Sequence, residues 1–284
     1  MASYGKIVVL SSLDGTRFDP YFDVTGATRE ALRPLVLERI PVVFFSSRTR
    51  GELEVIQEEL GICHPFVAEN GGALYIPQGY FGFGVAHSRA VASYEAIPYG
   101  RPYEQVVDAL RLTAEELGVS VIGFNDMSVR DVAVDCGFSL RQARLAKQRE
   151  YSEPFRITDL DPTAGPRLMQ ALRRKQWPCL NTGRYTLVSA ETDQGAIVDL
   201  LLTLYRRAFG PTVTVGIGDP VTNLALLKRV DIPFIGTTSA VLRATDVEAP
   251  SAVAVHPHAR VDALLEIVET LHASRNPLWR EVRH

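Results

Sequence analysis

Acidic, hydroxyl and guanidinium side chains directly follow several hydrophobic runs of this sequence. Asp14 lies in the segment SLDGT after the run IVVL, Asp219 follows TVTVGIG, and PVVFF is followed by Ser46, Ser47 and Arg48. Hydroxyl groups and backbone amides hold phosphate oxygens, and a carboxylate at such a place can bind Mg²⁺ that bridges to a phosphate. These residue types therefore predict anion and metal chemistry.

Two neighbouring positions lack the charge that such a site would use. Gln194 opens a hydrophobic helix with the segment DQGA, where the helix N-terminus attracts anions but a lysine would hold a phosphate better. Ser12 lies two residues before Asp14, where a phosphoryl-transfer loop of this shape is expected to carry a carboxylate. The hydroxyls of Ser11 and Ser12 could instead simply cap a turn. The sequence thus raises the question whether this site has changed its chemistry or lost it.

Runs of β-branched and aliphatic residues alternate with amphipathic segments, which is typical of a parallel α/β sheet. Hydrophobic runs predict strands, with their loops, at residues 7–10, 41–47, 212–220 and 231–236. Helical periodicity predicts helices at residues 28–38, 52–60 and 194–208. In an open α/β sheet, ligands bind at the carboxyl ends of the strands. We therefore expect the polar residues named above to converge at one edge of the sheet.

The middle of the chain, residues 83–185, is richer in Arg and Glu than the rest. Helices are predicted there at residues 103–117, 139–147 and 164–175, and strands at 119–124 and 154–157. We interpret this segment as an inserted α/β cap domain. The remaining chain, residues 1–82 plus 186–284, is predicted to form a doubly wound, Rossmann-like parallel-sheet core.

The composition argues against several classes of protein. Thirty basic and thirty-three acidic residues among 284 give a formal net charge of −3, without the basic excess that a nucleic-acid surface needs. No hydrophobic run approaches the ~20 residues that span a bilayer, and no signal peptide is evident. The widely spaced Cys63, Cys136 and Cys179 fit neither a disulfide framework nor a metal site, and His64 is expected in a loop. We therefore expect a cytoplasmic protein of two domains, with neither nucleic acid nor membrane as partner.

Several short motifs, in this order, resemble the haloacid dehalogenase superfamily of phosphatases and, within it, the mannosyl-3-phosphoglycerate phosphatase family. The motifs are SLDGT (12–16), SSRTRGE (46–52), ENGGALY (69–75), REYSEPF (149–155), TGRY (182–185), DQG (193–195) and GIGDPVTN (216–223). The pair formed by ENGGA and REYSEPF is the most specific, and the resemblance covers nearly the whole chain.

The resemblance implies phosphoryl transfer through a covalent intermediate. In that mechanism an aspartate takes the phosphoryl group, and a second aspartate two residues on acts as acid and base. A Ser or Thr and a Lys hold the phosphate, and Mg²⁺ is bound by residues of the first and last motifs. On this resemblance Asp14 matches the acid/base aspartate and offers its backbone carbonyl to Mg²⁺. Ser46 matches the phosphate hydroxyl, and Asp219 matches the metal carboxylate.

Three positions depart from the family pattern. Ser12 stands where the nucleophile belongs, and Gln194 stands where the lysine is expected. Asn223, a candidate metal ligand, stands where the last motif usually has a further acidic residue. Each change removes formal charge from the same site, so Mg²⁺ binding is expected to be weak or dependent on a ligand.

The resemblance also implies ligand contacts in the cap and in the second loop of the core. The candidates are Ser47, Arg48, Arg149, Ser152, Glu153, Thr182, Gly183 and Arg184. The arginines would pair with carboxylate or phosphate groups, and the expected ligand is a small phosphorylated sugar acid between cap and core. Alternatively, Arg48 is a solvated surface charge and Glu153 merely starts a strand.

Three hypotheses for the function follow. The leading one is a homologue of a sugar-phosphate phosphatase whose core site is impaired for hydrolysis but binds that ligand. The alternative is an active Mg²⁺-dependent phosphomonoesterase that hydrolyses mannosyl-3-phosphoglycerate or a related ester, by water attack or through Ser12. A further alternative is a non-catalytic interaction subunit, and the oligomeric state stays open.

Overall fold

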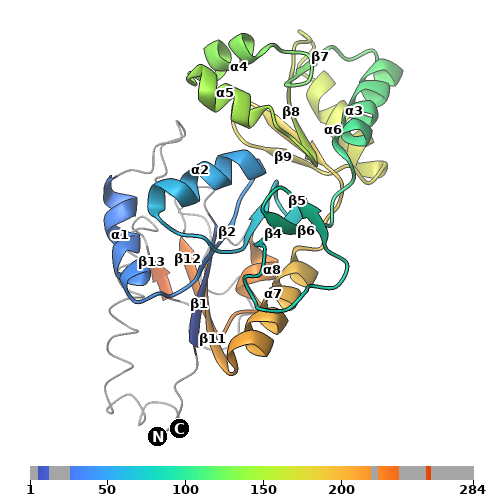
Figure 1. Cartoon of the computed structure of the whole chain (residues 1–284). Helices are drawn as coiled ribbons and strands as arrows, with labels where there is room; N and C mark the ends of the chain where they lie inside the picture. The colour runs from blue at the N-terminus through green and yellow to red at the C-terminus, as the bar shows by residue number, and fades with distance from the viewer. Residues whose placement is uncertain (1–5, 13–25, 219–222, 237–253, 257–284) are drawn as a thin grey trace, which may run out of the picture.

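The computed structural model describes residues 6–12, 26–218, 223–236 and 254–256, which form two β-sheets with helices packed against them (Figure 1). Within these residues, the larger sheet has nine strands in the order β13-β12-β11-β1-β2-β3-β4-β6-β5. The strands are β1 (Lys6–Ser12), β2 (Val42–Phe45), β3 (Phe66–Ala68), β4 (Ala73–Pro77), β5 (Arg89–Val91), β6 (Tyr94–Pro98), β11 (Thr212–Gly218), β12 (Ile232–Gly236) and β13 (Ala254–His256). From β13 to β3 the neighbouring strands are parallel, whereas β4, β6 and β5 are antiparallel to their neighbours.

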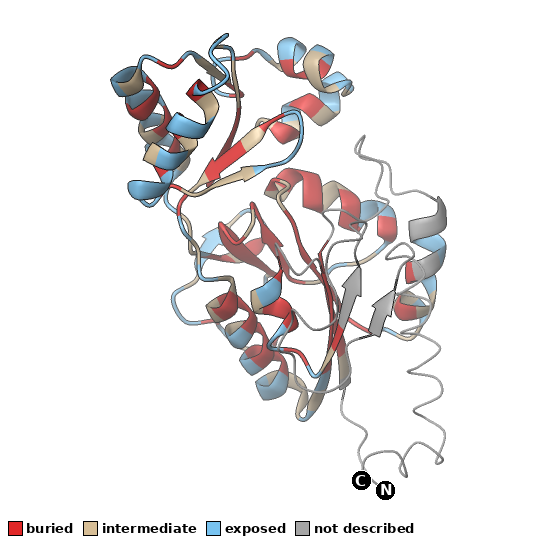
Figure 2. Ribbon diagram, turned by 180° about the vertical axis from the view of Figure 1, so that it is seen from behind, coloured by how far each residue is buried: buried red, intermediate tan, exposed pale blue. Residues whose placement is uncertain are grey.

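Helices cover both faces of this sheet because its central strands carry hydrophobic side chains on both faces. The helices are α1 (Gly26–Leu37), α2 (Arg50–Leu60), α7 (Gln194–Phe209) and α8 (Leu224–Leu227). Val9 of β1 packs with α1 and α2, whereas Val8 and Leu10 pack with α7 and α8, since successive residues of a strand point to opposite faces. Figure 2 shows buried central strands between helices that are exposed on their outer sides. The predicted doubly wound α/β core is confirmed.

A second, four-stranded antiparallel sheet lies beyond the larger one, in the order β7-β8-β10-β9 (Figure 1). Its strands are β7 (Val121–Gly123), β8 (Ser152–Ile157), β9 (Cys179–Asn181) and β10 (Thr186–Ser189), and its helices are α3 (Tyr103–Leu117), α4 (Val129–Cys136), α5 (Leu140–Ala146) and α6 (Ala164–Arg174). Phe155 of β8 packs with α3 and α6 in one hydrophobic cluster, and Tyr185 packs with α4 and α5 in another. We call this unit the cap and the larger unit the core.

The two sheets divide the chain differently from the predicted boundaries. Residues 89–98 form β5 and β6 of the larger sheet, although they fall within the predicted cap segment 83–185. Conversely, β10 belongs to the smaller sheet, although the core was predicted to resume at residue 186. The reason is that β6 pairs antiparallel with β4 and extends the core sheet past its parallel part. We therefore propose that the cap insertion begins after Pro98 and ends shortly after Ser189.

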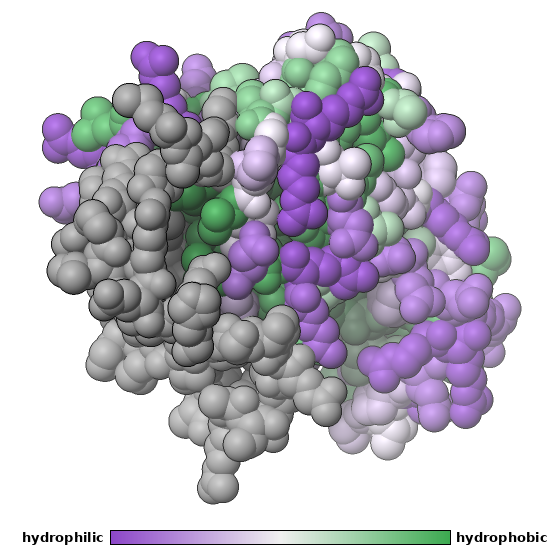
Figure 3. Space-filling model, turned by 90° about the horizontal axis from the view of Figure 1, so that it is seen from below, coloured by the Kyte–Doolittle hydropathy of each residue, from purple (hydrophilic) through white to green (hydrophobic). Residues whose placement is uncertain are grey.

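Within the described ranges, none of the helices has the length and hydrophobicity needed to cross a bilayer. Viewed from below, the described surface carries many hydrophilic side chains (Figure 3).

Candidate functional site

Ser12 lies at the carboxyl end of β1, in the floor of the predicted site. Its Cα pairs with that of Phe45, the last residue of β2. Ser12 is 0% exposed, and its backbone carbonyl accepts a hydrogen bond from the Ser11 hydroxyl at 3.4 Å. Because Ser46 directly follows Phe45, the sheet places Ser12 and Ser46 at adjacent strand ends.

The loop after β2 carries the predicted phosphate hydroxyl of Ser46. This side chain is buried, and its oxygen accepts a hydrogen bond from the Arg48 amide at 3.2 Å. The Ser46 amide donates to the Val67 carbonyl at 3.0 Å, and the Ser46 carbonyl accepts from the Asn70 amide at 2.8 Å. The loop is therefore held by β3 and by the turn that follows β3.

Gln194 reaches the same turn from α7. Asp193 caps this helix by accepting the Ala196 amide at 2.9 Å, which places Gln194 in the first turn. The Gln194 side-chain amide and the Thr192 hydroxyl both donate to the Asn70 carbonyl at 3.1 Å. Position 194 therefore supplies a neutral donor that already binds protein, where the resemblance implies a lysine.

Asn223 directly precedes α8 and lies against the end of β11. It is buried, and a Cβ atom added at Gly218 would lie 2.7 Å from the Asn223 Cβ. The predicted ligands Asp14 and Asp219 lie outside the described residues. Among the residues that the structure does describe, no group of three or more His, Cys, Asp or Glu side chains could hold a metal ion. At the ends of β1 and β11 the structure describes Ser12 and Asn223, and both side chains are neutral. The Mg²⁺ site stays a prediction.

Glu69, in the turn between β3 and β4, joins the core to the cap. Its side chain is buried, at 1% exposure, and its carboxylate accepts hydrogen bonds from the Glu150 amide (2.8 Å), the Tyr151 amide (3.0 Å) and the Ser152 hydroxyl (2.6 Å). Burial raises the pKa of Glu69, and the Arg149 guanidinium and these donors oppose that rise. Ser152, a predicted ligand contact, therefore takes part in joining the two units.

Arg149 reaches from the cap to the loop after β2. Its Nη1 donates to the Ser47 carbonyl at 2.7 Å, and its Nε donates to the Ala146 carbonyl at 3.0 Å. Beside it, the Thr49 hydroxyl donates to the Leu145 carbonyl in α5 at 3.0 Å. Two predicted ligand residues, Ser47 and Arg149, are thus in contact with each other. The cap packs directly on the loop that carries the predicted phosphate hydroxyl.

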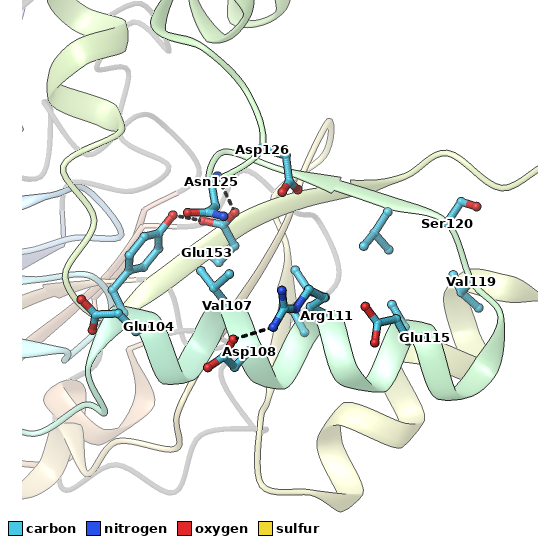
Figure 4. Close-up of a pocket in the computed structure, with 14 residues that line it drawn as sticks. Glu104, Val107, Asp108, Arg111, Glu115, Val119, Ser120, Asn125, Asp126 and Glu153 are labelled. Atoms are coloured by element: carbon cyan, nitrogen blue, oxygen red, sulfur yellow. Dashed lines mark hydrogen bonds and ion pairs between the residues drawn. The ribbon is translucent and has the colours of Figure 1, made fainter.

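Glu153 binds partners within the cap, on the side of α3. Its carboxylate accepts hydrogen bonds from the Tyr103 hydroxyl at 2.6 Å and the Asn125 amide at 2.8 Å, and burial raises its pKa. It lines a cavity of about 600 Å³ between α3 and the β7 segment (Figure 4). Ser152 and Glu153 are successive residues of β8, so their side chains lie on opposite faces of the cap sheet. Glu153 is therefore on the other face of the cap sheet from Ser152, although the Arg149 guanidinium is near enough to oppose the rise in its pKa.

Thr182, Gly183 and Arg184 lie in the turn between β9 and β10, at the far end of the cap sheet. Ser189, at the other end of β10, pairs with Ser152 at the junction. Since a strand rises by about 3.3 Å per residue, the turn lies roughly 10 Å or more from the junction along the sheet. These three predicted residues therefore form a group separate from Ser152 and Arg149.

Two arginines of the cap gather at Asp135, in the last turn of α4. Arg184 and Arg156 pair with its carboxylate at 2.9 and 3.5 Å. The Tyr185 hydroxyl, and after it the two arginines, lower the pKa of Asp135. The side chains of Arg184 and Arg156 are 62% and 40% exposed, and the buried Nε of Arg156 has no hydrogen-bond partner among the described residues. This group carries net positive charge at the cap surface.

Comparisons with known proteins decide to which family the chain belongs. No protein-family model matches it. It is 35% identical over 230 residues to the glucosyl-3-phosphoglycerate/mannosyl-3-phosphoglycerate phosphatase of Methanococcoides burtonii, which covers 81% of this chain and 84% of that protein. A protein of the same name from Persephonella marina is 30% identical over 231 residues, with the same shares covered. The chain belongs to the mannosyl-3-phosphoglycerate phosphatase family.

Solved structures show the fold of this family member. The crystal structure of Thermoplasma acidophilum 0175 superposes with a TM-score of 0.63 at 14% identity, covering 95% of this chain and 99% of that one. A haloacid dehalogenase-like hydrolase from Bacteroides thetaiotaomicron gives 0.62 at 16% identity, covering 94% and 100%. At such identities the likeness concerns the fold alone. The predicted resemblance to the haloacid dehalogenase superfamily, and within it to the mannosyl-3-phosphoglycerate phosphatases, is confirmed.

Two residues that the sequence analysis did not select now join the candidate site of this family member. Glu69 belongs to the motif ENGGALY and contacts the motif REYSEPF; both motifs carry the family resemblance, but nothing in the sequence indicated that they touch. Arg156 directly follows REYSEPF and shares one face of β8 with Ser152. Strand alternation from Ser152 could therefore have pointed to it.

Proposed function

We propose that this member of the mannosyl-3-phosphoglycerate phosphatase family binds a small phosphorylated sugar acid between core and cap, and that its site is impaired for hydrolysis of the phosphate ester. The fully buried Ser12 at the end of β1 carries this proposal. The family resemblance assigns this position to the aspartate that takes the phosphoryl group. A serine cannot form an acyl phosphate, and its oxygen is a weak nucleophile unless a base activates it.

Two further neutral residues support the loss of hydrolysis. At Gln194 an amide replaces the positive charge that would stabilise the transferring phosphoryl group, and it donates to the Asn70 carbonyl. Asn223 replaces a carboxylate near the end of β11. Losing the nucleophile from a group of residues that acts as a unit can cost on the order of 10⁶ in rate. A single substitution of the nucleophile would explain Ser12 but not Gln194 and Asn223. Loss of the catalytic function accounts for the neutral residues at all three positions.

Ligand binding is supported by the donors that remain. Ser46 keeps its hydroxyl at the carboxyl edge of the core sheet, and the guanidinium groups of Arg156 and Arg184 lie on the cap. The relatives are named as phosphatases of glucosyl-3-phosphoglycerate and mannosyl-3-phosphoglycerate. Both compounds carry a phosphate and a carboxylate, the two groups that arginine pairs with most readily.

Mg²⁺ is proposed as a partner that binds weakly without the ligand. By the resemblance, Asp219 would supply a carboxylate, Asp14 a backbone carbonyl and Asn223 an amide oxygen. Bound Mg²⁺ would offset the negative charge of the ligand phosphate. Calorimetry with Mg²⁺ alone should therefore show weak binding, and Ser12→Asp should strengthen it. Tight binding of Mg²⁺ to the unchanged protein would contradict this part of the proposal.

A thermal-shift titration tests whether the ligand binds. Mannosyl-3-phosphoglycerate or glucosyl-3-phosphoglycerate should raise the melting temperature, because a ligand at 100 times its Kd stabilises the folded state by about 2.7 kcal/mol. The matched control is the same glycoside of glycerate without its phosphate, which should give a smaller shift. If neither phosphorylated compound shifts the melting curve, the proposed ligand class is wrong and the interaction-subunit hypothesis takes its place.

A further inference from the structure

Glu69 occupies a position between the predicted phosphate loop and the cap. Its backbone amide donates to the Arg48 carbonyl at 3.0 Å, while its side chain bonds to residues 150–152 on the other side. Both Glu69 and Asn70 have left-handed backbone conformations, with φ of 50° and 56°. Non-glycine residues hold this conformation only where the surroundings determine it. The turn is therefore built to place this one carboxylate.

The carboxylate holds the cap segment that leads from α5 into β8. One oxygen accepts from the Glu150 amide at 2.8 Å, and the other accepts from the Tyr151 amide at 3.0 Å and the Ser152 hydroxyl at 2.6 Å. With Glu69 buried, water does not readily replace these bonds. A neutral side chain of the same shape could not accept all three, because an amide offers one oxygen instead of two.

The same turn also holds the chain where it leaves the core for the cap. The Gly72 carbonyl accepts from the Tyr99 and Gly100 amides at 2.9 and 2.8 Å. Gly72 itself lies so close to the cap segment before β8 that an added Cβ would be 2.5 Å from the Tyr151 Cβ. The second connection, from β10 back to α7, meets the same turn, because the Thr192 hydroxyl donates to the Asn70 carbonyl at 3.1 Å. Both connections between core and cap therefore lie against residues 70–72, and Glu69 bonds the cap segment 150–152 beside them.

Fixing residues 150–152 also fixes Arg149. Its guanidinium donates to the Ser47 carbonyl at 2.7 Å, next to the predicted phosphate hydroxyl of Ser46. We infer that Glu69 is a positioning residue: it sets where the cap lies over the loop after β2, and through that placement it sets the affinity for the phosphorylated ligand. The part of this inference that concerns ligand affinity rests on the proposed function. The part that concerns the position of the cap rests on the contacts of Glu69.

The test compares Glu69→Gln with the unchanged full-length protein in two measurements. Hydrogen exchange followed by mass spectrometry should show residues 150–152 exchanging roughly tenfold faster or more, because the single amide oxygen of glutamine cannot accept all three bonds. Calorimetry with mannosyl-3-phosphoglycerate should show Kd rising by a similar factor, although the variant is folded. Ser152→Ala removes only the hydroxyl bond and should give a smaller change in both measurements.

Glu153→Gln is the matched control for the exchange measurement. Glu153 is also a buried carboxylate, but its donors, Tyr103 and Asn125, both lie within the cap. This variant keeps the three bonds of Glu69 and should change exchange at residues 150–152 by much less than Glu69→Gln does. Equal exchange of these residues in Glu69→Gln and in the unchanged protein would overturn the inference, as would faster exchange with an unchanged Kd. If the unchanged protein binds neither phosphorylated ligand, the proposed function fails, and the exchange comparison alone decides whether Glu69 places the cap.

Discussion

The floor of the core site and the junction beneath the cap lie on neighbouring loops, yet they differ in the ionisable side chains that they carry. At the floor, Ser12, Gln194 and Asn223 are neutral at the positions where the family resemblance implies two carboxylates and a lysine. At the junction, Glu69 and Arg149 have ionisable side chains, and the described structure provides both with partners. On the roles proposed above, placing the cap and transferring a phosphoryl group use separate residues, so one can change while the other stays.

The largest effect is expected from rebuilding the floor. The triple variant Ser12→Asp, Gln194→Lys and Asn223→Asp should raise the rate of phosphate release from mannosyl-3-phosphoglycerate with Mg²⁺ by about 10³-fold or more, because the residues act as a unit. The control is the double variant that keeps Ser12, which should stay near background. An inert triple variant that is folded and binds the ligand would show that the junction has diverged as well.

A second prediction concerns the pH dependence of the free energy of unfolding, which His64 should cause although it lies neither in the floor nor in the junction. His64 Nδ1 lies 2.9 Å from the Tyr80 hydroxyl, and burial lowers the pKa of His64 to about 4. In the unfolded chain the pKa of His64 is about 6.5, so below this pH the unfolded chain binds the proton more readily than the folded protein does. The free energy of unfolding should therefore fall by up to roughly 3 kcal/mol as the pH is lowered from 6.5 to 4. Urea unfolding at several pH values should show this loss reduced in His64→Gln, and an unchanged loss would refute the assignment.

A third prediction probes the contact between the core turn at Gly72 and the cap segment at Tyr151. Gly72→Ala should lower the free energy of unfolding by about 1–3 kcal/mol, because the new methyl would lie 2.5 Å from the Tyr151 Cβ and force the chains apart. Gly84→Ala is the control, since nothing lies within 4 Å of a Cβ added there, and it should change stability by no more than about 0.5 kcal/mol. Equal urea midpoints for the two variants would contradict the close packing.

The smallest effect on stability is expected from Arg184→Ala. The side chain is 62% exposed and pairs with Asp135 at the surface, so its removal should cost less than about 1 kcal/mol of folding free energy. If the cap arginines bind the ligand, the same variant should nevertheless weaken the thermal shift by mannosyl-3-phosphoglycerate. If the ligand raises the melting temperature of Arg184→Ala as much as that of the unchanged protein, Arg184 does not bind the ligand, and Arg156 and the junction residues remain as candidates.

Much of the core could be predicted from the sequence, because buried strands and capped helices leave local signals. The run IVVL became β1, and α2 begins with a capping box in which Thr49 and Glu52 bond each other's backbone amides. The cap was harder. Strand β5 has only exposed or half-buried residues, so no hydrophobic alternation marks it as part of the core sheet. The short helix α4 was missed, although Ser128 and Asp131 form a capping box at its start.

For the site, the sequence predicted the strand ends but not the direction of each cap side chain. Ser152 and Glu153 were both expected to face the ligand, yet adjacent strand residues must face opposite ways. Which of them faces the core depends on how β8 packs, and that is set by distant residues such as Glu69 and Tyr103. The group at Asp135 likewise joins residues about 20–50 positions apart along the chain.

The central claim is that the site binds its phosphorylated ligand without hydrolysing it at an ordinary rate. The most direct test is phosphate release from mannosyl-3-phosphoglycerate with Mg²⁺, at a ligand concentration shown by calorimetry to saturate the protein. We predict release hardly above the background without protein. Turnover of about 1 s⁻¹ or faster, within the range of ordinary enzymes, would contradict the claim and make the chain an active phosphatase despite Ser12.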